Sequence, residues 1–120
     1  MRVLPLVLAL PLALAVGPVL AGDVEITDAK ARKSGDTWRF DVTLLHGDTG
    51  WDHYADAWRV VGPDGTVYGT RILAHPHVNE QPFTRSLSGV EIPSGVTSVT
   101  IEAKDSVHGW AEETYTLTLE

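Results

Sequence analysis

The sequence contains no cysteine, and its single methionine is Met1. Without cysteine the chain can form no disulfide, so its folded part must be held together by packing alone. The same absence excludes a lipid anchor on cysteine and a cysteine nucleophile. Once Met1 is removed with an N-terminal leader, thioether ligands are missing as well as thiolates, and this excludes the usual soft sites for Cu(I).

Basic residues are also scarce. The chain has 9 Lys and Arg against 16 Asp and Glu, which gives a formal net charge of −7. Because Arg2 lies in the leader, the remainder carries a charge of about −8. Such an acidic domain does not bind nucleic acid by attraction to phosphates, nor anionic membrane surfaces through charge. We interpret the charge as a contribution to solubility.

The only long apolar run lies at the N-terminus. Arg2 precedes an apolar stretch over residues 3–15, and the small-residue pattern VLA follows at residues 19–21. This order predicts a signal peptide, residues 1–21, cleaved after Ala21, and hence a periplasmic or secreted protein with no membrane anchor left after cleavage. A retained anchor is the alternative, but three prolines and a glycine in the run disfavour a continuous spanning helix.

Residues 22–120 have the length of one domain. Apolar and polar residues alternate with a period of two over residues 38–44, 99–103 and 115–119, which predicts half-buried β-strands. No stretch has convincing helical periodicity. Four further strands are predicted around Val24 and Ile26, at 55–61, at 66–73 and at 83–92, the last with a possible bulge at Ser88-Gly89.

Two kinds of connection alternate along this path. Tight turns at residues 34–36, 62–65 and 93–95 follow the first, third and fifth strands, whereas longer loops rich in His, Asp and Trp follow the second, fourth and sixth. Alternate connections of an up-and-down strand path emerge at the same pole. The pattern predicts an all-β, seven-stranded antiparallel sandwich with plain turns at one pole and its unusual chemistry at the other.

Residues 92–101, IPSGVTSVTI, are similar to the hairpin that joins late strands in immunoglobulin-like domains. On this segment and the strand pattern, the chain resembles small exported bacterial β-sandwich domains of the immunoglobulin-like or fibronectin-III-like type. The resemblance implies an immunoglobulin-like sandwich for residues 22–120. The disulfide-bonded version of that fold is not matched, and no catalytic or ligand residue can be transferred.

All five histidines fall in the three long loops. In the extended segment His75-Pro76-His77, residues two apart point the same way, so both imidazoles can face one ion. His46 continues the inward parity of its strand, and His108 lies in the third loop. We therefore predict that His46, His75, His77 and His108 bind Cu(II) or Zn(II) in one site, since imidazole is a common ligand of both ions.

Two further residues are candidates for a supporting role. Asp105 continues the inward parity of its strand, and a buried carboxylate needs a partner, which is an arginine, a histidine or an ion. It is predicted to orient an imidazole from behind or to act as an additional ligand. His53 has no readable side-chain direction, so it is placed below the other four histidines.

The alternative is a binding module without metal. Trp51, Tyr54 and Trp110 lie in the same loops and could contact a glycan or a protein partner, or they could simply close the end of the core. An enzyme is not predicted. The chain has no G-x-S-x-G motif, and Ser106 lies too close in sequence to Asp105 and His108 to form a catalytic triad with them.

Overall fold

The computed structural model describes residues 23–120, so the predicted signal peptide lies outside the described residues. This part of the chain contains β-strands and no helix. Accordingly, no described segment forms a helix that could cross a membrane. The strands are β1 (Glu25–Ser34), β2 (Thr37–Leu45), β3 (Ala55–Val61), β4 (Val67–Ile72), β5 (Phe83–Val90), β6 (Ser98–Asp105), β7 (Gly109–Trp110) and β8 (Tyr115–Thr118).

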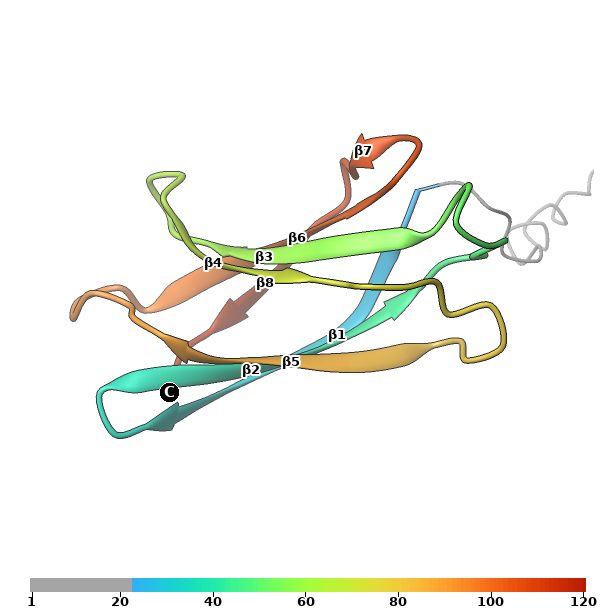
Figure 1. Ribbon diagram of the computed structural model, residues 1–120. Coiled ribbons are helices and arrows are strands. Elements are labelled where there is room, and N and C mark those ends of the chain that lie inside the picture. Colours follow the sequence, from blue (N-terminus) through green and yellow to red (C-terminus); the bar gives the residue numbers. More distant parts are fainter. Residues whose placement is uncertain (1–22) are drawn as a thin grey trace, which may run out of the picture.

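The strands form two antiparallel sheets that lie one above the other (Figure 1). One sheet has three strands in the order β1-β2-β5. The other has five, in the order β4-β3-β6-β7, with β8 also pairing with β6. The all-β prediction is confirmed, and the seven predicted strands correspond to β1–β6 and β8. The extra strand β7 has two residues and arises because the loop after β6 folds back onto Lys104 and Asp105.

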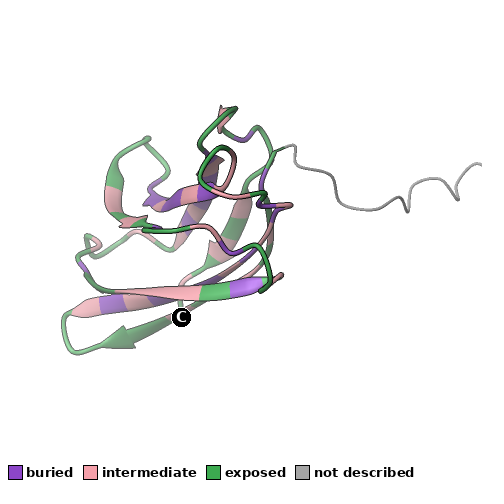
Figure 2. Ribbon diagram, turned by 45° about the vertical axis from the view of Figure 1, so that its right-hand side comes forward, coloured by how far each residue is buried: buried purple, intermediate pink, exposed green. Residues whose placement is uncertain are grey.

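The core lies between the two sheets, where inward residues alternate with more exposed ones (Figure 2). Along β2 every second residue is buried, as the period of two requires. Trp58, Phe40 and Phe83 are the largest fully buried side chains. Burial is confirmed for eight predicted core residues: Trp38, Phe40, Val42, Leu44, Trp58, Val60, Val99 and Ile101. Tyr115 and Leu117 are only partly buried, because β8 is short and pairs with β6 alone.

The predicted bulge lies in β5. Trp38 pairs with Val90 and Phe40 pairs with Leu87, so β5 contains one residue more than β2 across this step. Gly89 has a φ of 72°, a conformation that glycine adopts without steric cost.

The two poles differ as expected (Figure 1). The tight turns between β1 and β2, β3 and β4, and β5 and β6 lie at one end of the strands. The loops after β2, β4 and β6 lie at the other end, and they contain all five histidines. The fold therefore gathers residues that are as many as 62 positions apart in the sequence, from His46 to His108.

Candidate metal site

Asp105, the last residue of β6, is the centre of the histidine-bearing pole. Only 1% of its surface is exposed. Its Oδ1 accepts hydrogen bonds from the backbone N–H groups of Val107, at 2.8 Å, and His108, at 2.7 Å. These two bonds turn the chain at the end of β6 and fix the carboxylate in place. Both bonds go to Oδ1, and the imidazoles around the carboxylate face both of its oxygens.

Three imidazoles surround this carboxylate. Nε2 of His53 lies 3.2 Å from Asp105 Oδ1, and Nδ1 of His108 lies 3.1 Å from Oδ2. Nε2 of His46 lies 3.8 Å from the same Oδ2. The ring centres of His46 and His53 are 4.8 Å apart, and those of His53 and His108 are 5.0 Å apart. The arrangement joins the loop after β2 to the loop after β6.

His46 continues the inward alternation of β2 and is completely buried. Its Nδ1 lies 2.5 Å from Oδ1 of Asp48, which is also buried. The same Asp48 oxygen accepts the backbone N–H of Ala55 at 3.1 Å. Asp48 thus holds one ring nitrogen of His46, while the other nitrogen lies on the side of Asp105.

Asp48 also connects this cluster to the loop after β4. Its Oδ2 accepts the backbone N–H of His77 at 2.8 Å. Gln81 makes a second link, since its Oε1 accepts the backbone N–H of His46 and its Nε2 donates to the backbone carbonyl of His77. Neither Asp48 nor Gln81 was predicted as a site residue. Asp48 could have been found, because it continues the inward parity of β2 beyond His46.

Two groups of described residues have ligand atoms close enough to hold an ion, with all ligand atoms within 4.8 Å of one another. The first is His46, His53 and Asp105, and the second is Asp23, Asp105 and His108. The first group is the more enclosed, because two of its members are buried.

The four histidines predicted to share one ion are therefore divided in the structure. His46 and His108 lie beside Asp105, whereas neither group within residues 23–120 includes His75 or His77. The physical reason is the position of β4 at the edge of its sheet, from which the next loop passes toward β5. There the His77 ring stacks on Phe83, the first residue of β5, with ring centres 3.9 Å apart. His53, which was placed below the other histidines, is in the first group.

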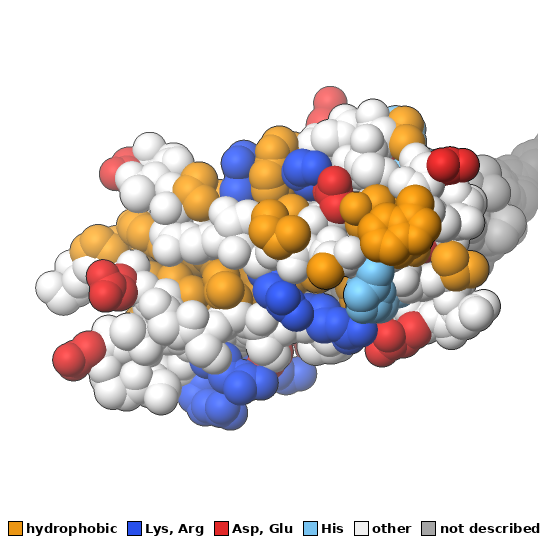
Figure 3. Space-filling view, in the orientation of Figure 1, with side chains coloured by type: hydrophobic (Ala, Val, Ile, Leu, Met, Phe, Trp, Pro, Cys, Tyr) orange, Lys and Arg blue, Asp and Glu red, His pale blue; other side chains and the backbone are white. Residues whose placement is uncertain are grey.

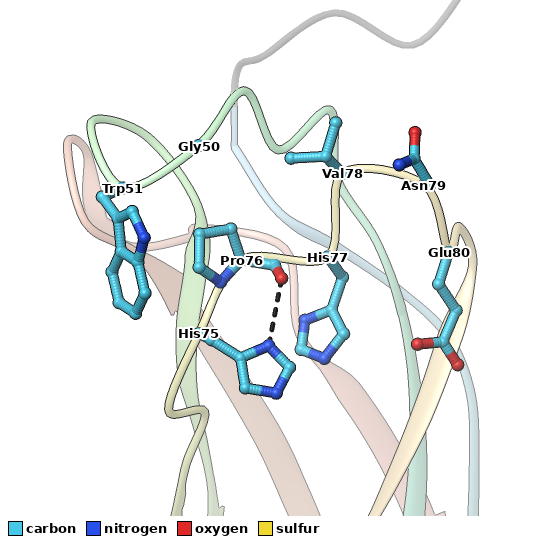
Figure 4. A pocket seen from close by; sticks show the side chains of 8 residues that line it. All are labelled: Gly50, Trp51, His75, Pro76, His77, Val78, Asn79 and Glu80. Atoms are coloured by element: carbon cyan, nitrogen blue, oxygen red, sulfur yellow. Dashed lines mark hydrogen bonds between the residues drawn. The ribbon is translucent and has the colours of Figure 1, made fainter.

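His75 and His77 form a pair of their own (Figure 4). Their ring centres are 4.7 Å apart. His75 is exposed and its Nδ1 donates to the carbonyl of Pro76, whereas His77 is buried. A cleft of about 510 Å³ opens beside them, and Trp51 and Glu80 also line it.

Two pKa shifts bear on this pole. Burial alone would raise the pKa of Asp105, but the N–H groups of His108 and Val107 and the His108 ring outweigh it, so the net shift is downward. Asp105 is therefore a carboxylate at neutral pH. Burial, together with the charge of Arg85, lowers the pKa of His77 below its ordinary value of 6.5. The His77 ring is then neutral at neutral pH, which is the form that binds metals.

The three loop aromatics, Trp51, Tyr54 and Trp110, differ in how much of their surface a partner could contact. Trp51 is 67% exposed and makes an edge-to-face contact with Tyr54 at 5.5 Å between ring centres. Trp110 is covered on one face, because the guanidinium carbon of Arg59 lies 3.7 Å from its ring centre. Figure 3 shows exposed apolar side chains gathered beside a histidine at the loop pole.

Comparison with known proteins gives one relative. The chain is 41% identical over 90 residues to a protein named "Putative lipoprotein" from Halomicrobium mukohataei, and the match covers 75% of this chain. The chain spans 43% of the length of that relative. No family model matches the chain. No solved structure matches it either.

Proposed function

We propose that this is an exported metal-binding β-sandwich protein of the immunoglobulin-like type, which binds Cu(II) or Zn(II) through His46, His53 and Asp105. The observation that carries the proposal is the convergence of their three ligand atoms within 4.8 Å of one another. His108, with Nδ1 3.1 Å from Asp105 Oδ2, is the candidate for a fourth ligand.

The ligand atoms would have to draw together somewhat to hold an ion. Ligand atoms about 2.0–2.1 Å from an ion with tetrahedral geometry lie about 3.3 Å from one another. Nε2 of His53 lies 3.2 Å from Oδ1 of Asp105, while Nδ1 of His108 and Nε2 of His46 lie 3.1 Å and 3.8 Å from Oδ2. The ligand atoms of His46, His53 and Asp105 all lie within 4.8 Å of one another, so the side chains would move inward when an ion binds.

The surroundings of His46 also favour a ligand role. Its Nδ1 donates to Asp48, so Nε2 carries the lone pair that faces the other ligands. A carboxylate behind an imidazole fixes the ring tautomer and makes the ligand nitrogen more basic. A site with three ligands from the chain also leaves room for water or His108.

The choice between the two ions stays open, because imidazole and carboxylate ligands suit both Zn(II) and tetragonal Cu(II). The proposal is one of binding and not of catalysis. A carrier, a buffer or a sensor of the ion is the class of protein that it describes.

Export is part of the proposal. It is supported by the leader-like pattern of residues 1–21 and by the name of the relative, which describes a lipoprotein. Residues 1–120 include no cysteine to carry a lipid, and we propose a periplasmic or secreted location.

A binding module without metal is the second candidate, and the exposure of Trp51 favours it. A tryptophan that is 67% exposed beside a cleft offers a flat face for a sugar ring or a partner protein. Trp110 contributes less to this reading, since Arg59 covers one of its faces. Replacement Trp51→Ala should abolish binding to such a partner while leaving metal affinity unchanged.

The test of the metal proposal is metal analysis of the exported protein, followed by titration with Cu(II) and with Zn(II). The His53→Ala variant should bind the ion about tenfold or more weakly, because the change removes a ligand with little effect on the core. Asp52→Ala is the matched control, since Asp52 is the exposed neighbour in the same loop. Equal affinities of parent and His53→Ala would overturn the proposal.

A further inference from the structure

His77 is buried in an unusual way. Only 6% of its surface is exposed, and neither ring nitrogen has a hydrogen-bond partner among the described residues. Burying a polar group without a partner is unfavourable. A phenylalanine would fill the same space without that penalty. The presence of an imidazole therefore points to a role for its nitrogens.

Two other rings lie close to the His77 ring. It stacks on Phe83, with ring centres 3.9 Å apart and an interplanar angle of 11°. The ring of His75 is 4.7 Å away and tilted by 38°. The stacking on Phe83 holds the His77 ring in place, and the His75 and His77 rings lie side by side at the cleft (Figure 4).

His75 offers a ligand nitrogen of its own. A carbonyl oxygen can only accept a hydrogen bond, so Nδ1 of His75, 3.1 Å from the oxygen of Pro76, must carry the ring proton. The lone pair of the neutral ring is then on Nε2, for which no hydrogen-bond partner occurs within residues 23–120. The Pro76 carbonyl thus acts on His75 much as the Asp48 carboxylate acts on His46.

The spacing of the two rings suits one ion. Two imidazoles bound through nitrogens about 2.0–2.1 Å from an ion, at an angle of about 90–110°, have ring centres about 4.5–5 Å apart. The observed separation of 4.7 Å falls in this range. The adjoining cleft of about 510 Å³ has room for the water molecules that complete such a shell.

We infer that His75 and His77 form a second, outer binding site for Cu(II) or Zn(II), separate from the cluster at Asp105. The two sites share no ligand, so the outer site does not depend on the proposed function. Glu80 lines the same cleft and supplies a nearby negative charge.

The outer site should be the weaker of the two. It offers two ligands from the chain, whereas the group of His46, His53 and Asp105 offers three. The guanidinium of Arg85 lies 5.5 Å from the ring of Phe83 and pairs with Glu80 at 3.1 Å, which reduces the negative charge available to a cation. We expect Cu(II) to show the site more clearly than Zn(II), because Cu(II) binds the same ligands more tightly.

The experiment is a titration of the exported protein with Cu(II), followed by equilibrium dialysis. The parent should bind two equivalents, one tightly and one weakly. The variant His75→Gln/His77→Phe removes both ligands and keeps an aromatic ring on Phe83. It should bind only the tight equivalent. His53→Ala should bind the tight equivalent about tenfold or more weakly and leave the weak one unchanged.

Folding of the double variant can be checked by urea unfolding of the metal-free protein. Because Phe removes two buried nitrogens without partners, the metal-free variant should be as stable as the parent or more stable. The single variant His75→Gln alters an exposed side chain and should by itself weaken the outer site about tenfold or more.

The outcomes separate the two sites. If the double variant binds as many equivalents as the parent, with the same affinities, the outer site is overturned and the Asp105 site is unaffected. If the parent binds one equivalent that the double variant loses and His53→Ala retains, the outer site stands and the proposed function fails. If the parent binds neither Cu(II) nor Zn(II), both are overturned.

Discussion

Nδ1 of His46 lies 2.5 Å from Oδ1 of Asp48, and both side chains are fully buried. A carboxylate in this position accepts a hydrogen bond from the protonated ring nitrogen that faces it, and leaves the opposite nitrogen with the lone pair of a ligand atom. Asp48 also accepts the backbone N–H groups of Ala55 and His77, so one carboxylate orients the proposed ligand and joins two loops.

Replacing Asp48 by Asn should therefore change both stability and metal binding. Asparagine has one acceptor oxygen where aspartate has two, so one of the three hydrogen bonds is lost or weakened. We expect destabilisation of about 1–3 kcal/mol by urea unfolding. We also expect metal affinity at the Asp105 cluster to fall about 10- to 100-fold by titration, since the His46 tautomer is no longer held.

The control for this variant is Asp52→Asn, four residues further along the same loop. Asp52 is exposed, so the change should leave stability within about 0.5 kcal/mol of the parent. If Asp48→Asn and Asp52→Asn behaved alike in both measurements, the buried contact with His46 would contribute neither to stability nor to metal binding.

A second prediction concerns the core. Phe40 is completely buried at the centre of β2, and Phe40→Ala should destabilise the protein by about 3–5 kcal/mol in denaturant unfolding. Val67→Ala is the comparison, because Val67 is 45% exposed on β4 and should cost about 0.5 kcal/mol or less. Similar losses for both variants would show that the two-sheet core is not what stabilises this fold.

The sequence was informative where one periodicity decides the structure. Alternation along β2 and β6 predicted the burial of Phe40 and Ile101 and the inward direction of His46 and Asp105. Because side chains alternate strictly along a strand, the inward direction could be extended to Asp105 at the end of β6 and to His46 just after β2. The placement of the histidine-bearing loops at one pole followed from the same strand path.

The loop interiors could not be predicted in the same way. His53 lies beyond any periodic segment, and its side chain is positioned by local turn bonds, such as its N–H to the carbonyl of Gly50. The separation of His77 from His46 depends on stacking against Phe83, a contact between residues on different elements. Such contacts depend on tertiary packing, and neither periodicity nor spacing encodes them.

A third prediction is a pH dependence of stability at Asp41 on β2. The Ser86 hydroxyl donates to the Asp41 carboxylate, and with Arg39 it holds the Asp41 pKa below its ordinary value of 3.8, against the opposing effect of burial. A lowered pKa in the folded state stabilises the protein above the unfolded value. That contribution is lost as the pH falls through the lower folded value.

Asp41→Asn should therefore destabilise the protein by about 0.5–1.5 kcal/mol near neutral pH. The difference from the parent should shrink as the pH falls below 3.8 and through the lower pKa of the folded state, where the parent carboxyl becomes protonated. Urea unfolding of parent and variant across this pH range measures the difference in stability, with Asp36→Asn in the neighbouring exposed turn as the control. A difference that stayed constant down to acid pH would show that the carboxylate charge is not responsible.

The last prediction follows from the linkage between binding and folding. An ion that binds only the folded chain stabilises it by about 2.7 kcal/mol when the free ion is 100 times its dissociation constant. For a domain of this size, that corresponds to a rise of about 10 °C or more in Tm. Zn(II) should produce this rise in the parent by calorimetry, and a chelator should reverse it. His53→Ala should respond much less, because it lacks one ligand of the buried site. An equal rise in parent and variant would place the stabilising ion elsewhere on the molecule.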